Sequence, residues 1–120
     1  MSNHDLSLVK LTVKNNNIKI RELKAIRDYF LSVASDLKKE NSENSENELN
    51  IDKALHNVRI YILATEVWIH SIDSNNKLLQ NKPWSDGKRQ DYTRKANKLN
   101  NLGLVPEFLI AEYLNTNQVN

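Results

Sequence analysis

Cysteine is absent from this 120-residue chain, and glycine and proline occur only twice each. Without a thiol, the chain cannot form a disulfide scaffold, a cysteine-ligated zinc site, an iron–sulfur cluster or a cysteine nucleophile. The two glycines, Gly87 and Gly103, are too few for either common glycine-rich phosphate-binding loop. We therefore expect neither a resident metal nor a cofactor.

Long apolar runs and a large net charge are missing as well. The longest uninterrupted apolar stretch, Ile60 to Ala64, is far shorter than the roughly 20 residues that cross a bilayer. Residues 1–10 lack the basic start and the apolar core of a signal peptide. The net charge of +2 indicates no particular class of partner. These features predict a cytoplasmic protein that does not associate with a membrane.

Helical periodicity dominates what is present. Apolar residues recur at spacings of three and four over about 17–39, and again over about 51–72. A third helix is expected to begin near Ser85 and end before Gly103, and a fourth to begin at Pro106. We therefore predict an all-α fold, a bundle of about four helices with a long central helix, as a single domain over 1–120. Its last residues, 115–120, are expected to fray.

The N-terminal element, residues 1–16, allows two interpretations. Apolar and polar residues alternate over 9–13, which is the pattern of a strand, and the asparagines at 15–17 would then form the turn of a β-hairpin. Alternatively, Leu6, Val9 and Val13 share one face of a short helix that Asp5 would cap. The sequence does not separate the hairpin from the helix.

Asparagine is unusually frequent, with 18 of the 120 residues. The asparagines at 15–17, 41–47 and 75–76 lie between helical patterns, and we interpret these segments as connections. Within the second of them, Ser45 and Glu48 have the spacing of a capping box that would start the central helix.

The central helix is more apolar than a surface helix needs to be. Its apolar arc covers well over half of the circumference, whereas a helix lying on a core needs about 100°. The helix is therefore either surrounded by other helices or buries a second face in a homodimer. The candidates for such self-association are Ile60, Leu63 and Val67.

A polar stripe runs along the same helix. Its candidate functional residues are His56, Arg59, Glu66 and His70. The stripe is interpreted as a solvated face with local ion pairs, as a buried polar network or partner-binding face, or as a metal or catalytic site. Glu66 and His70 have i, i+4 spacing and would supply two metal ligands, but His56 is ~21 Å from His70 along a helix. A third ligand would have to come from elsewhere.

A basic segment extends from Lys82 to Lys98, with six cations and two acids. Its candidate binding residues are Lys88, Arg89, Arg94, Lys95 and Lys98, together with Trp84. Cations interleaved with an aromatic residue suit phosphate contact and base stacking, so nucleic acid is one expected partner. A solvated cationic face and a site for an acidic protein are the other interpretations.

Charge of opposite sign is segregated along the chain. Residues 10–27 carry six cations and one acid, whereas residues 36–52 carry six acids and two lysines. Such patches favour docking to another protein. The leading hypothesis is a small non-enzymatic regulator or inhibitor of viral or mobile-element origin, of the immunity, antitoxin or phage anti-defence type, that blocks a partner protein sterically and electrostatically. The alternatives are a nucleic-acid-binding protein that uses the third helix and a metal enzyme that depends on Glu66 and His70.

Overall fold

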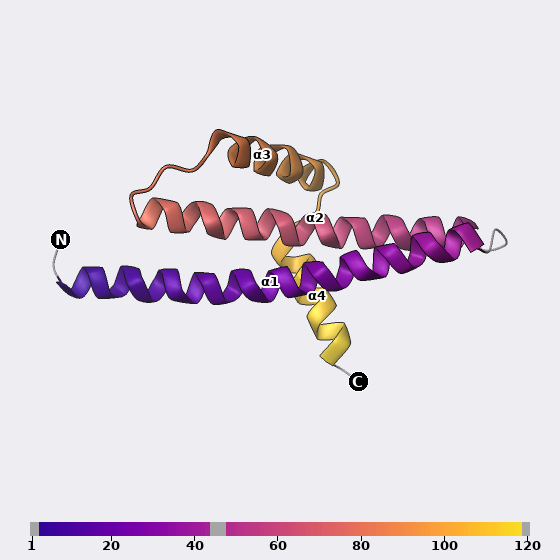
Figure 1. The fold of residues 1–120 in the computed structure, drawn as a ribbon, viewed down its shortest axis with the longest axis horizontal. Coiled ribbons are helices and arrows are strands. Elements are labelled where there is room, and N and C mark those ends of the chain that lie inside the picture. The colour runs from indigo at the N-terminus through magenta and orange to yellow at the C-terminus, as the bar shows by residue number, and fades with distance from the viewer. Residues whose placement is uncertain (1–2, 44–47, 119–120) are drawn as a thin grey trace.

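Four α-helices account for most of the computed structural model, which describes residues 3–43 and 48–118. They are α1 (Asn3–Glu43), α2 (Glu48–Leu79), α3 (Asp86–Asn101) and α4 (Pro106–Gln118). In Figure 1, α1 and α2 lie side by side as a long antiparallel pair, α3 lies along α2 on the side away from α1, and α4 crosses the pair. No strand occurs among the described residues, so the predicted all-α bundle with a long central helix is confirmed.

The N-terminal hairpin is not found, and the alternative short helix is part of a much longer one. α1 is continuous from Asn3, because α2 is long enough to provide an apolar surface along residues 6–20. Val9 and Val13 lie near Leu79 at the far end of α2, where they line a shared pocket. The alternation that resembled a strand therefore arises from two apolar faces of one helix, and tertiary packing overrides the local pattern.

Several asparagines lie inside helices, which corrects their interpretation as connections. The Asn16 side-chain amide donates to Asn76 Oδ1 at 2.8 Å, and the Asn76 amide donates to Asn17 Oδ1 at 3.0 Å. Asn76 is buried, and these bonds satisfy its amide between α1 and α2. As in coiled coils, one buried asparagine favours a single register of the two helices. The proposed capping residue Ser45 lies outside the described residues.

The core forms where α3 and α4 meet the long pair. Its buried residues are Leu23, Ala64, Val67, Ile69, Leu99 and Ile110, and all four helices contribute. An aromatic cluster adjoins it where α4 crosses, since the Phe30 ring stacks on Tyr61 at 5.1 Å and meets Tyr113 edge-on at 4.8 Å. Three helices thus cover most of the wide apolar arc of α2 within one chain, and a homodimer stays a prediction.

Both predicted ends of α3 are confirmed by their hydrogen bonds. The Ser85 hydroxyl accepts the backbone N–H of the residue three positions on, at 3.2 Å. At the other end, Gly103 has a φ of 71°, and the Leu104 N–H donates to the Leu99 carbonyl at 3.0 Å. This is a Schellman cap, which turns the chain from α3 into α4.

The end of the chain and the helix lengths complete the fold. α4 continues to Gln118, so the fraying expected for 115–120 stays a prediction, and the last two residues lie outside the described part. Over the described ranges, no helix combines the length and the apolar content that a membrane crossing requires.

Candidate functional site

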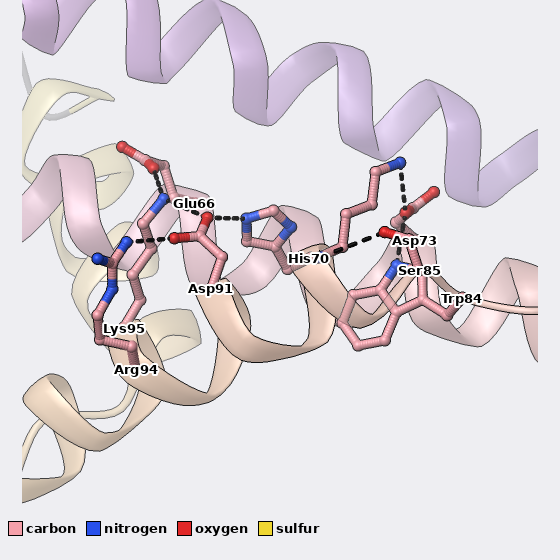
Figure 2. Close-up of polar contacts among 9 residues, drawn as sticks. Glu66, His70, Asp73, Trp84, Ser85, Asp91, Arg94 and Lys95 are labelled. Carbon is pink, nitrogen blue, oxygen red and sulfur yellow. Dashed lines mark hydrogen bonds and ion pairs between the residues drawn. The ribbon is translucent and has the colours of Figure 1, made fainter.

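The polar stripe of α2 and the basic face of α3 lie against each other. The two helices run antiparallel, which places Lys95 beside Glu66 and Asp91 beside His70 (Figure 2). The Lys95 ammonium pairs with the Glu66 carboxylate and lies 2.9 Å from the Asp91 carboxylate. Asp91 also accepts from Arg94, and its other oxygen lies 3.3 Å from His70 Nε2. Only 19% of the Lys95 side chain is exposed, so this cation is not presented to a partner.

A second group of polar contacts holds the segment that leads into α3. The indole N–H of Trp84 donates to Asp73 at 3.0 Å, and the Lys88 ammonium lies 3.6 Å from the same carboxylate oxygen (Figure 2). The Trp84 ring also lies 6.5 Å from His70 and 5.8 Å from Tyr92. Trp84 therefore anchors the α2–α3 connection and does not stand as a free stacking surface.

These contacts distinguish between the alternative interpretations of the polar stripe of α2 and of the basic segment that contains α3. Glu66 and His70 do not form a solvated intrahelical pair, because each has its partner on α3. Of the basic candidates, Lys88, Arg94 and Lys95 have acidic neighbours, while Arg89 and Lys98 are exposed and have no ion pair within the described part of the chain. The basic face is thus smaller than the sequence suggests.

The residues suggested as metal ligands are engaged in these same contacts. Glu66 pairs with a lysine, and His70 contacts Asp91. Within residues 3–43 and 48–118, no three histidine, aspartate or glutamate side chains gather in an arrangement that would hold a metal ion.

The ion pairs shift the pKa of Asp91 and of Lys95. The hydrogen bond from Lys95 is the largest influence on Asp91; burial opposes it and Arg94 adds to it, so the pKa falls from 3.8 to about 2. Burial alone would lower the pKa of Lys95, but its hydrogen bonds to Glu66 and Asp91 outweigh that effect and raise it. Both shifts favour the charged forms in the folded protein.

The depressed pKa of Asp91 predicts a loss of stability in acid. Because Asp91 ionises near pH 3.8 when unfolded and near 2 when folded, its stabilising effect is complete above about pH 4 and decreases toward pH 2. Urea unfolding of the wild type and of Asp91→Asn between pH 6 and pH 2 measures this effect. The difference in unfolding free energy between the two proteins should shrink as the pH falls, and a constant difference would contradict the assignment.

A groove opens where α3 ends and α2 continues. Its lining residues are His56, Arg59, Ile60 and Leu63 from α2, and Lys98, Asn101 and Leu102 from the end of α3. The volume is about 460 Å³. Ile60 and Leu63 are partly buried and form an apolar floor, and Leu102 forms one wall with 55% of its surface exposed. The side chains of Arg59 and Lys98 are exposed at the rim.

This groove, which we call the α2–α3 groove, unites parts of all three predicted residue sets. Ile60 and Leu63 come from the self-association set, Arg59 from the polar stripe and Lys98 from the basic helix. Val67, the third residue of the self-association set, is instead buried in the core. The other residues of the basic set do not line the groove.

Sequence reasoning missed the contribution of Leu102 to the groove. The residue continues the apolar stripe of α3, three positions after the buried Leu99. Its place directly before Gly103 was a usable signal, because it marks Leu102 as the C-cap residue, at which the apolar stripe of α3 ends. Comparison with protein families, curated proteins and solved structures finds no match for this chain.

Proposed function

We propose that the protein is a non-enzymatic protein-binding regulator, and that the α2–α3 groove takes an apolar anchor side chain flanked by carboxylates. One observation carries this proposal: an apolar floor lies directly beside exposed cations, with Ile60 and Leu63 next to Arg59 and Lys98. Binding energy in protein interfaces concentrates on a few large apolar or aromatic side chains that fill such pockets.

The charge of the groove specifies the partner further. None of its seven lining residues is acidic. Arg59 and Lys98 carry positive charge, and His56 is the third residue with a basic side chain. An acidic segment around the anchor would be attracted to this rim, which increases the association rate and disfavours basic partners. Bound there, a partner protein is blocked at the surface that supplies the anchor, as an immunity protein, antitoxin or anti-defence inhibitor would require.

Nucleic acid is the weaker candidate for the same surface. Lys88, Arg94 and Lys95 are already compensated by acids of this chain, which leaves Arg89 and Lys98 as the cations of the predicted set on α3 that have no ion pair within the described residues. A phosphate backbone would also gain nothing from the apolar floor of the groove. The cytoplasmic location and the viral or mobile-element origin stay predictions.

Selection from a random peptide library tests this proposal. The full-length protein is the target, and the double variant Lys98→Glu/Leu102→Asp removes non-specific binders in a counter-selection. We expect the enriched peptides to combine a large apolar residue with neighbouring aspartate or glutamate. Their affinity for the double variant should be at least about tenfold weaker, which corresponds to about 1.4 kcal/mol.

Leu78→Asp provides the matched control, since Leu78 is also an exposed leucine but lies outside the groove. This variant should bind the selected peptides as the wild type does, and circular dichroism should show equal helicity for all variants. Peptides without an apolar anchor, or peptides that bind the double variant equally well, would overturn the proposal. Salt-sensitive DNA binding that Arg89→Glu weakens and Leu102→Asp does not would favour nucleic acid instead.

A further inference from the structure

α1 carries a second apolar face, which is exposed and lies beside the face that packs on α2. Leu8, Leu11 and Ile18 are 53%, 57% and 40% exposed, although the same helix buries Leu23 and Phe30. Leu11 and Ile18 are seven residues apart, so they lie on one line along the helix. This line lies to one side of the residues that pack on α2, because its edge residue Glu22 pairs with Lys19, which contacts the Trp68 ring of α2.

The outward residues have the spacing of a coiled-coil seam. Positions 8, 11, 15, 18, 22 and 25 alternate in steps of three and four, and we call them the α1 outer seam; they are Leu8, Leu11, Asn15, Ile18, Glu22 and Ala25. All six are exposed. α4 crosses α1 near Tyr29 and Phe30, which Tyr113 contacts, and these two residues lie outside the α1 outer seam. Within the part of the chain that the structure describes, the six seam residues are therefore accessible to a partner.

Positive charge flanks the α1 outer seam. Residues 10–24 contain five cations and one acid. Lys10, Lys14, Arg21 and Lys24 are exposed, whereas Lys19 lies 4.7 Å from the centre of the Trp68 ring and 3.8 Å from Glu22. Two copies of this chain that met through their seams would bring these cations together in either orientation. A second copy is therefore disfavoured, and an acidic surface is favoured.

We propose that the α1 outer seam docks an acidic amphipathic helix of a partner protein in coiled-coil fashion. The partner would present apolar residues to Leu8, Leu11 and Ile18, and glutamates or aspartates to the flanking cations. This inference does not rest on the α2–α3 groove, because α3 lies on the side of α2 that faces away from α1. One chain then binds two protein segments at two separate surfaces.

The polar members of the seam favour a helix over a lipid surface. Asn15 and Glu22 lie between the apolar positions, so a membrane would have to accept a carboxylate within the inserted face. A helix can instead place a hydrogen-bonding residue opposite Asn15 and a cation opposite Glu22, which fixes register and partner choice. Nucleic acid would leave the exposed leucines unused.

Two designed peptides test the inference with the full-length protein. Both are three-heptad helices with leucine and isoleucine at the positions that face Leu8, Leu11 and Ile18, asparagine facing Asn15 and lysine facing Glu22. One has glutamate and the other lysine at the flanking positions. Fluorescence anisotropy should show binding of the glutamate peptide and at least tenfold weaker binding of the lysine peptide. The variant Leu11→Asp/Ile18→Asp should lose at least tenfold in affinity, and Lys14→Glu/Arg21→Glu should reverse the preference between the peptides.

Leu31→Asp is the matched control, because Leu31 is an exposed leucine of α1 outside the seam, and it should bind normally. Leu102→Asp should also bind normally, so failure of the groove proposal and failure of this one are distinguishable. Equal binding of both peptides, or binding that ignores the seam variants, would overturn the inference. So would a Leu11-dependent dimer in sedimentation, or Leu11-dependent binding to phosphatidylserine vesicles without binding of the glutamate peptide.

Discussion

Replacing Leu23 by alanine is expected to lower the free energy of unfolding by about 3 kcal/mol. Leu23 is fully buried, and it belongs to the core cluster in which α1 meets Ala64 and Val67 of α2. Removing its branched end loses apolar burial and leaves a cavity that two long, stiff helices cannot collapse into fully. Urea denaturation followed by circular dichroism at 222 nm measures the change.

Leu31→Ala is the control for this substitution. Leu31 lies on the same helix but is 46% exposed, so its truncation should change the unfolding free energy by less than about 0.5 kcal/mol. Both variants carry the same change in helix propensity, and the difference between them isolates the burial. Equal losses for Leu23→Ala and Leu31→Ala would contradict the packing of α1 on α2.

Replacing Lys95 by alanine is the second substitution with a large expected effect, about 2 kcal/mol of destabilisation. The change leaves the carboxylates of Glu66 and Asp91 without the ammonium that lies between them. Removing one member of a fully buried pair costs about 3–5 kcal/mol, and the partial exposure of these carboxylates reduces that figure. Thermal unfolding measures the loss, and hydrogen exchange should show it first in the amides of α3.

The control for this substitution is Lys98→Ala, one turn further along α3. Its side chain is exposed at the rim of the groove, so the loss of charge should cost less than about 0.5 kcal/mol. If Lys98→Ala destabilised the protein as much as Lys95→Ala does, the polar contacts between α2 and α3 would not be what holds α3 in place.

The attachment of α3 matters for binding because α3 forms one wall of the α2–α3 groove. Among the residues of α3, all of which the structure describes, Leu99 alone is buried. Tyr92 and Ala96 are partly buried against the core, and ionic contacts through Lys88, Asp91 and Lys95 supply the rest of the attachment. Acid and high salt should therefore loosen this wall before the α1–α2 pair unfolds, since both weaken partly exposed ion pairs.

Local patterns were sufficient to predict most helices and both ends of α3. The signals at Ser85 and Gly103 involve neighbours within a few residues, so no tertiary information is needed to interpret them. The N-terminal segment was different, because the surface that keeps residues 6–20 helical is the end of α2, some 60 residues away in sequence. The asparagines at 16 and 76 looked like turn residues for the same reason, since their partners are remote.

The candidate groove was predicted only in fragments. Ile60, Leu63, Arg59 and Lys98 were each singled out, but for three different roles, and Leu102 was not among them. The charge of Lys95 was visible in the sequence, whereas its burial against Glu66 was not, because that depends on α3 packing antiparallel on α2. Whether a cation is free or compensated is a property of the neighbouring helix.

The sequence by itself determined that the chain is helical, where α3 begins and ends, and which residue types are available for chemistry. Periodicity and capping act over a few residues, so the local sequence contains both signals. Only the tertiary structure decided which side chains face each other. Contacts among Glu66, His70, Asp91 and Lys95 hold α3 against α2. The α2–α3 groove and the α1 outer seam are left exposed. That choice depends on the antiparallel packing and register of whole helices, which bring together residues far apart in the chain.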